Sequence, residues 1–149
     1  MLAAQRLVRL IETHSDGLAA SLLEKTQQSE KTANYIDRVP PEDLRQRVRE
    51  IYQHLGQWLI SKREADVEQR YLEIGALRCR QGVLFSQLLW ATLLVKDNLF
   101  EFLNQEAAIE RPSEVFGELE IVQLLNQFFD QAVYYAALGY ERTRTQAAA

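Results

Sequence analysis

The sequence predicts an all-α protein with about five to six helices around one hydrophobic core. Its 149 residues are the size of a single domain, and 47% hydrophobic against 26% charged residues supply enough apolar side chains for an ordered core. Six glycines and three prolines are too few for the frequent turns of an all-β fold. Apolar residues instead recur at the three- and four-residue spacing of amphipathic helices.

The first predicted helical region covers residues 2–28. Ser15 and Asp16 are common helix caps, so we expect them to divide this region into two helices. A short segment, 35–39, then leads to Pro40. The apolar stripe of the first region consists of Ala4, Leu7, Val8, Ile11, Leu18, Ala19 and Leu22.

Residues 41–63 form the clearest amphipathic helix of the chain. Pro41 suits the first helical position, and Glu42 and Asp43 place negative charge in the first turn, where the helix dipole favours it. The densest cationic stretch lies on the charged side of this helix. We interpret it as a solvated surface because acidic residues are interleaved with Arg45, Arg47 and Arg49.

A further helix is predicted over residues 64–81, with Gly82 as its C-terminal stop. Gly75 and Ala76 lie on a side of this helix where the side chains are small, which predicts a close crossing with another helix. Cys79 lies on the same side. We interpret it as a packing residue and not as a reactive thiol, despite its two flanking arginines.

The segment 86–106 is predicted to be the central buried helix, with Ser86 as its cap. Its first turns are apolar on nearly every side, which is typical of a helix surrounded by a core. It also contains the longest apolar run of the chain, residues 88–95, which is far shorter than the roughly 20 residues that span a bilayer. We therefore expect no membrane association.

The last predicted helix, residues 112–143, is the longest. We expect one domain over residues 1–143, with 144–149 as a frayed tail or linker. The apolar residues of this helix form two stripes about 100° apart, more than one small core requires. The second stripe predicts a two-fold homodimer, whose expected interface includes Val122, Phe129, Val133 and Tyr140. The alternative to this dimer is a last helix that is buried on both sides in the core of its own chain.

The charge balance excludes a typical nucleic-acid binder. Seventeen Lys and Arg against twenty-one Asp and Glu give a net charge of −4, without a basic cluster. The N-terminal stretch lacks the uninterrupted apolar segment of a signal peptide, and the single cysteine fits a reducing compartment. The expected location is the cytoplasm.

No known catalytic or metal-binding pattern is present in the sequence. Both histidines, His14 and His54, lie in the first half of the chain, whereas a globin of this length holds its proximal haem ligand in the later half. Glu50 and His54 are four residues apart, and the Glu-x-x-His pairs of di-iron bundles are absent. There is no nucleophile elbow and no glycine-rich phosphate loop. We expect no cofactor, no metal and no catalytic residue.

A second hypothesis is a sensor that encloses a ligand. In that case Trp58, Trp90 and Phe100 would surround a small apolar molecule or a tetrapyrrole. The competing interpretation is that these aromatic residues are ordinary core. A small enzyme is a third hypothesis, which two or more convergent titratable groups in one pocket would support.

The stretch 65–103 resembles the N-terminal domain of the RsbR/RsbT co-antagonist family. In that family an arginine-containing helix runs through a Gln-Gly turn into an apolar helix. Tyr35, Pro40, Pro41 and Leu44 and the aromatic helix ending near Tyr140 occur in a similar order, so the resemblance extends over most of residues 5–142. The matching positions of the central stretch are Arg78, Gln81, Gly82, Val83, Ser86, Leu88 and Leu89.

The resemblance implies a globin-like helical domain without haem that dimerises and serves as an input or scaffold module in bacterial signalling. It also implies a partner or an attached output domain of the STAS, kinase or transcriptional type, as in stressosomes and sensor kinases. Because no output domain follows within these 149 residues, we expect a free-standing relative or a shortened chain. In the second case residues 144–149 would be the linker.

Overall fold

The computed structural model describes residues 2–61, 63–106 and 114–148, and these residues form an all-α fold. No strand occurs among them, so the predicted fold class is confirmed. The predicted start of the last helix, at residues 112–113, lies outside the described residues. The described ranges contain more helices than predicted: α1 (Leu2–Thr13), α2 (Ser15–Gln28), α3 (Ala33–Arg38), α4 (Pro41–Gln53), α5 (Glu64–Arg80), α6 (Phe85–Glu106) and α7 (Glu114–Ala148).

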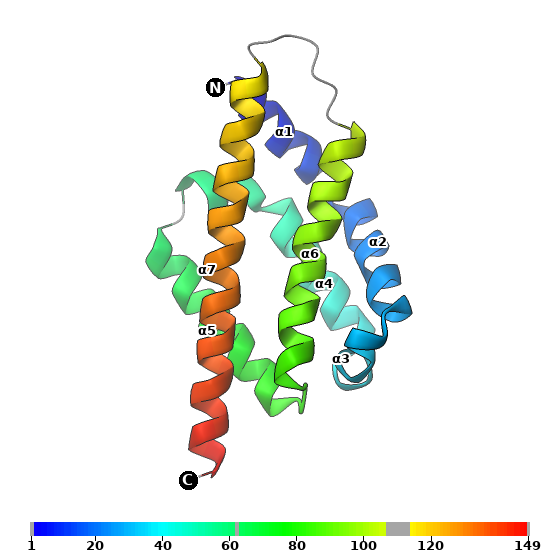
Figure 1. Cartoon of the computed structure of the whole chain (residues 1–149), viewed down its shortest axis with the longest axis vertical. Coiled ribbons are helices and arrows are strands. Elements are labelled where there is room, and N and C mark those ends of the chain that lie inside the picture. The colour runs from blue at the N-terminus through cyan, green and yellow to red at the C-terminus, as the bar shows by residue number, and fades with distance from the viewer. Residues whose placement is uncertain (1, 62, 107–113, 149) are drawn as a thin grey trace.

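The helix α7 runs along the longest axis of the molecule, and α6 lies beside it (Figure 1). On the far side of this pair, α5 crosses α7 and packs against it, while α4 passes behind α6. The helix α2 packs on both α4 and α6, and α1 packs against α7. The core between these layers includes the fully enclosed side chains of Tyr52, Leu55, Leu99, Leu125 and Ala132.

The break between α1 and α2 lies at His14, one residue before the predicted caps. The His14 backbone N–H donates to the Leu10 carbonyl oxygen at 3.1 Å, and a ring nitrogen of His14 lies 2.8 Å from the same oxygen. The helix α2 begins without a side-chain cap. Asp16 instead pairs with Arg49 at 3.3 Å. The division into two helices is confirmed, and the predicted cap was wrong.

The helix α4 begins at Pro41, as predicted, with two acidic residues in its first turn. It ends at Gln53, before the predicted end at residue 63, and a turn of π-helix covers Gln57–Ser61. Tyr52 and Leu55 are both fully buried across this break. The apolar periodicity that predicted one helix therefore continues through two shorter helical segments.

Gly82 ends α5, as predicted. Its φ is +78°, a left-handed conformation that glycine adopts at little cost. The Gly82 N–H donates to the Cys79 carbonyl oxygen, and the Val83 N–H donates to the Arg78 carbonyl oxygen, both at 3.1 Å. These two hydrogen bonds are those of a Schellman motif, which stops the helix and turns the chain into α6.

The helix α6 is a surface helix, so the prediction of a central buried helix was wrong. Leu93, in the middle of α6, is 40% exposed. No other described helix lies in front of α6 in Figure 1, and the exposed side of α6 carries Leu93 among the polar residues Ser86, Asp97, Glu101 and Asn104. The start of α6 depends on α3 and not on a Ser86 cap, because the Asn34 side-chain oxygen accepts the Leu84 N–H at 2.8 Å.

The crossing of α5 and α7 brings two backbones into direct contact at two glycines. A Cβ atom on Gly75 would overlap the backbone of Ala136, and one on Gly139 would overlap the backbone of Leu72. Each glycine therefore makes room for the opposite helix. The close crossing at Gly75 was predicted from small side chains, whereas its counterpart on α7, Gly139, was not.

The helix α7 continues through Ala148, so the expected tail at residues 144–149 is helical as far as it is described. Residues 141–147 are exposed except for the half-buried Thr143. In Figure 1 this C-terminal part of α7 extends beyond the ends of α5 and α6. Within the described chain, no helix has a stretch that is long and apolar enough to cross a membrane.

Candidate functional site

The candidate site is a cavity of about 60 Å³ in the interior of the helix bundle. Helices α2, α4, α5, α6 and α7 all contribute to its walls, and α3 contributes Tyr35. Most of the lining is apolar, with two guanidinium groups and a few hydroxyl groups among the aliphatic and aromatic side chains. The apolar lining includes Leu22, Val48, Leu88, Val95, Phe129 and Ala132.

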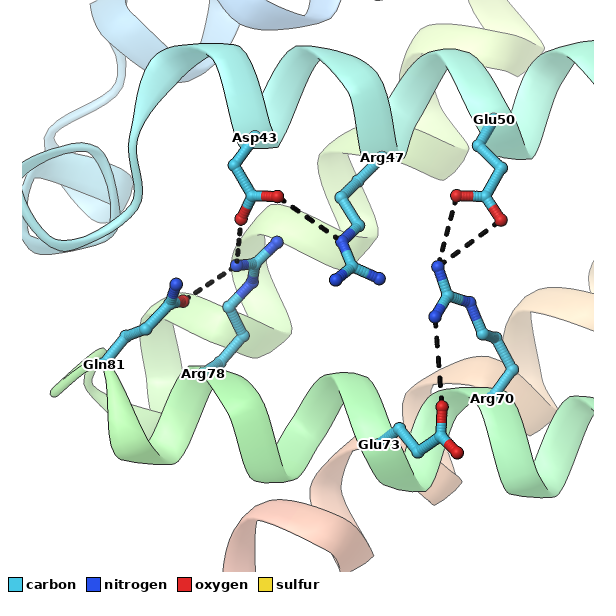
Figure 2. Close-up of polar contacts among 7 residues, drawn as sticks. All are labelled: Asp43, Arg47, Glu50, Arg70, Glu73, Arg78 and Gln81. Carbon is cyan, nitrogen blue, oxygen red and sulfur yellow. Dashed lines mark hydrogen bonds and ion pairs between the residues drawn. The ribbon is translucent and has the colours of Figure 1, made fainter.

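Arg78 is the most unusual residue of this cavity because its charged side chain is 1% exposed. Its Nη1 donates to the Gln81 Oε1 at 2.8 Å and to the Asp43 Oδ2 at 3.4 Å (Figure 2). The guanidinium carbon lies 5.4 Å from the centre of the Tyr35 ring. The Arg78 Nε is buried and has no hydrogen-bond partner. A buried guanidinium with an unused donor is energetically costly.

Two guanidinium groups share one carboxylate at the edge of the cavity. The Arg47 Nε lies 3.7 Å from the Asp43 Oδ1, while Arg78 reaches the other oxygen of the same carboxylate. Among the described residues, Asp43 is the one carboxylate that pairs with Arg47 or Arg78. The three groups carry a net charge of +1. Of the three arginines interpreted as a solvated surface, Arg45 and Arg49 are exposed, whereas Arg47 is half-buried and also lines the cavity.

The neighbouring arginine of α5, Arg70, is paired differently. Its Nη2 lies 3.2 Å from a carboxylate oxygen of Glu50, and its Nη1 lies 4.0 Å from one of Glu73. Figure 2 shows Arg70 and Arg78 on the same side of α5, both reaching toward α4. Two carboxylates face Arg70, whereas Arg78 shares its single carboxylate with Arg47.

The hydroxyl groups around the cavity are neutral. Burial raises the pKa of both Tyr35 and Tyr71, and the nearby Arg78 opposes this effect at Tyr35 without cancelling it. The Thr26 hydroxyl donates to the Leu23 carbonyl oxygen at 2.7 Å, so its proton is engaged within α2. The charge of the cavity therefore comes from its arginines.

The structure places the four predicted interface residues in two different environments. Phe129 and Tyr140 belong to the core of the chain itself, with exposures of 2% and 7%. The Tyr140 ring lies 5.1 Å from the Phe85 ring, and its hydroxyl donates to the Val83 carbonyl oxygen. Val122 and Val133 are half-buried. The second apolar stripe of the last helix is thus largely covered by the chain's own helices.

A partly exposed apolar face remains on α6 and α7, which we call the α6–α7 face. On α6 it consists of Leu89, Leu93 and Phe100 at helical spacing, and the ammonium group of Lys96 on the same stripe lies 5.9 Å from the centre of the Phe100 ring. On α7 it consists of Val122, Val133 and Ala137. The contact between Phe85 and Tyr140 shows that these sides of the two helices adjoin.

The three aromatic residues of the ligand-enclosing hypothesis do not line the cavity. Trp58 packs against Tyr71 and Phe128, with ring centres 6.4 and 6.0 Å apart. Trp90 lies under the Lys31 ammonium group on another part of the molecule. This cavity therefore does not support the ligand-enclosing hypothesis, and Trp58 and Phe100 pack against the core, as the competing interpretation held.

The remaining candidates from the sequence lie outside the cavity. His14 and His54 are both exposed, one between α1 and α2 and the other at the end of α4. Cys79 is half-buried and packs against the core. The burial of Arg78 was not predicted, because two arginines in the last turn of a helix, Arg78 and Arg80, are typical of a solvated helix end.

A family model for the RsbT co-antagonist protein RsbRD N-terminal domain matches residues 16–149. This match agrees with the resemblance carried by the Gln-Gly turn and the helices around it. No curated protein and no solved structure matches the chain. The family is one of signalling domains and not a known enzyme family. The chain therefore belongs to the RsbRD N-terminal domain family, a stress-signalling family of the stressosome type.

Proposed function

We propose that this domain is a non-enzymatic, cytoplasmic input module that dimerises and relays a signal along α7 to an output module or partner protein. The observation that carries the proposal is the form of α7 in a chain of this signalling family. At 35 residues α7 is about 52 Å long, given the 1.5 Å rise of each helical residue. Its residues Phe129, Ala132 and Ala136 line the cavity, and its C-terminal part extends beyond the ends of α5 and α6.

The proposed dimer interface is the α6–α7 face, with a second copy of the chain as its occupant. An antiparallel or parallel pairing of two such helix pairs would form a four-helix bundle, which buries partly exposed stripes of this kind. Leu93 and Val133 are the proposed central contacts. Phe129 and Tyr140 support this surface from inside instead of contacting the partner, because they are buried in the protomer.

The relay requires two packing states of the dimer with a small difference in free energy. A signal that favours one state shifts the population toward it, and the C-terminal end of α7 moves accordingly. An output of the STAS, kinase or transcriptional type joined to that end would read the change. Because α7 is helical through Ala148, a displacement of its core portion is transmitted directly to its exposed end.

The dimer can be tested with charged substitutions on the proposed interface. We expect Leu93→Glu and Val133→Glu to give a folded monomer, because the glutamate carboxylate would have to be buried between two protomers. Sedimentation velocity gives the mass, and circular dichroism confirms the helix content. The matched control is Leu84→Glu, since Leu84 is 54% exposed, lies before α6 and is not one of the residues of the α6–α7 face. A dimer mass for both interface variants would refute this interface, and a wild-type monomer would refute dimerisation.

A further inference from the structure

We propose that the cavity beside Arg78 binds a short-chain carboxylate, whose charged group pairs with Arg78 and Arg47 and whose carbon chain contacts the apolar wall. This inference goes beyond the proposed relay, since binding does not require a dimer. It assigns a ligand class to a cavity that α7 helps to form.

The first argument is the charge of the site. An arginine side chain remains protonated under all ordinary conditions, so the buried Arg78 cannot reduce its cost by losing its proton. Asp43 partly neutralises Arg78 but also faces Arg47, and its own side chain is 37% exposed. One positive charge is left over. An anion that enters from the cavity side supplies the missing negative charge.

The second argument is the unused donor. The Arg78 Nη1 is engaged by both Asp43 and Gln81, while the buried Nε has no partner. Carboxylates accept hydrogen bonds from adjacent N–H groups of a guanidinium in a fork geometry. A carboxylate oxygen facing the Nε would satisfy this donor. Arg70 offers no comparable donor into this cavity, because it faces two carboxylates of its own and does not line the cavity.

The third argument is the size and chemistry of the remaining space. A cavity of about 150 Å³ lined by apolar side chains holds benzene, and this cavity of about 60 Å³ is smaller. It therefore suits a ligand of a few heavy atoms, such as acetate or propionate. The lining beyond the arginines is mostly aliphatic and aromatic, which favours a ligand with a short hydrocarbon part over a fully hydrated inorganic anion.

The position of the cavity links occupancy to α7. Ala136 lines the cavity and also lies in the close contact between α5 and α7. Arg78 belongs to α5, while Ala132 and Phe129 belong to α7. A ligand that contacts both helices changes the relative stability of their arrangements, which is the property that a signalling input needs.

The test observes the Arg78 Nε–H directly by nitrogen-15 NMR of the full chain. Sodium acetate and sodium propionate are titrated at constant ionic strength, with sodium chloride as the exchanged salt. The Arg78 signal is assigned by its loss in Arg78→Lys. We expect a saturable shift of this signal with either carboxylate and no shift with chloride. Arg70→Lys is the matched control, and it should keep the full response.

A cavity-filling variant completes the test without removing a charge. Ala91 lines the cavity and is 6% exposed, so Ala91→Leu places a larger side chain in the space for the ligand. We expect the Arg78 signal to persist in this variant and its response to carboxylate to be lost. If Arg78→Lys does not fold, comparison of the wild type with Ala91→Leu still identifies the signal that responds. An unchanged wild-type signal, an equal response to chloride, or a full response in Ala91→Leu would overturn the proposal.

Discussion

Asn98 is a buried polar residue whose hydrogen bonds join three helices. Its side-chain nitrogen donates to the Leu18 carbonyl oxygen of α2 at 3.0 Å and lies 3.4 Å from the Tyr52 hydroxyl of α4. Its side-chain oxygen accepts from Lys25 at 2.8 Å and from Ser21 at 3.2 Å. Because Asn98 is 2% exposed, these partners cannot be replaced by bulk water.

Replacing Asn98 by leucine should therefore destabilise the domain. The substitution removes a donor from the Leu18 carbonyl oxygen and an acceptor from Lys25, so we expect a loss of about 1–3 kcal/mol in the free energy of unfolding. Urea denaturation followed by circular dichroism measures it. Asn104→Leu, at an exposed position of the same helix, should change stability by less than about 0.5 kcal/mol. Equal stabilities for the two variants would show that the Asn98 bonds are not important for the fold.

Phe129 and Tyr140 provide a second prediction at the scale of residues. Glutamate at either position places a carboxylate in the core, so we expect the thermal midpoint to fall strongly or the chain to unfold. Tyr134→Glu is the control on the same helix, because Tyr134 is 60% exposed, and it should leave the midpoint nearly unchanged. Thermal melts followed by circular dichroism distinguish these outcomes. A stable, folded Phe129→Glu variant would instead support the interface that the sequence pattern suggested.

The positions where helices begin and end depend on local chemistry, whereas the burial of each side of a helix depends on the rest of the fold. Pro41 and Gly82 mark helix ends by backbone restrictions that operate within a few residues, and both ends were predicted. The exposure of α6 was missed because its first turns are apolar on nearly every side, and such a segment fits a buried position and an interface position equally well. The burial of Arg78 depends on Asp43 and Gln81 approaching it in the folded chain, which no local spacing reveals.

The paired glycines of α5 and α7 give a prediction at the scale of elements. Gly75→Ala and Gly139→Ala should each destabilise the domain by about 1–3 kcal/mol, because the added methyl group overlaps the opposite backbone. This result would be opposite to the intrinsic preference of helices for alanine. Gly17→Ala is the control, since no atom lies within 4 Å of the added Cβ, and it should stabilise α2 by about 0.5–1 kcal/mol. Chemical denaturation of the three variants is sufficient. Stabilisation at all three positions would contradict the close crossing.

At the scale of the whole molecule, the sequence allowed the fold class, the family and the long last helix to be predicted. These properties depend on composition, periodicity and the order of motifs along the chain. The candidate cavity was not predicted in its correct place, because its walls come from six helices that are distant in sequence. The predicted interface on the last helix combined two core residues with two half-buried ones. Periodicity identifies the apolar sides of a helix but not which neighbour covers each side.

The close backbone contacts of α5 and α7 at Gly75 and at Gly139 also limit how the molecule can change shape. Where two helices meet through long side chains, they can slide by altering rotamers, as in shear motions. Here the two backbones touch, and no intervening side chain is available to rearrange. We therefore expect α5 and α7 to move as one rigid lever, pivoting against α6 instead of sliding past each other. A small tilt near the cavity would then be magnified over the length of α7 into a larger swing of its exposed end.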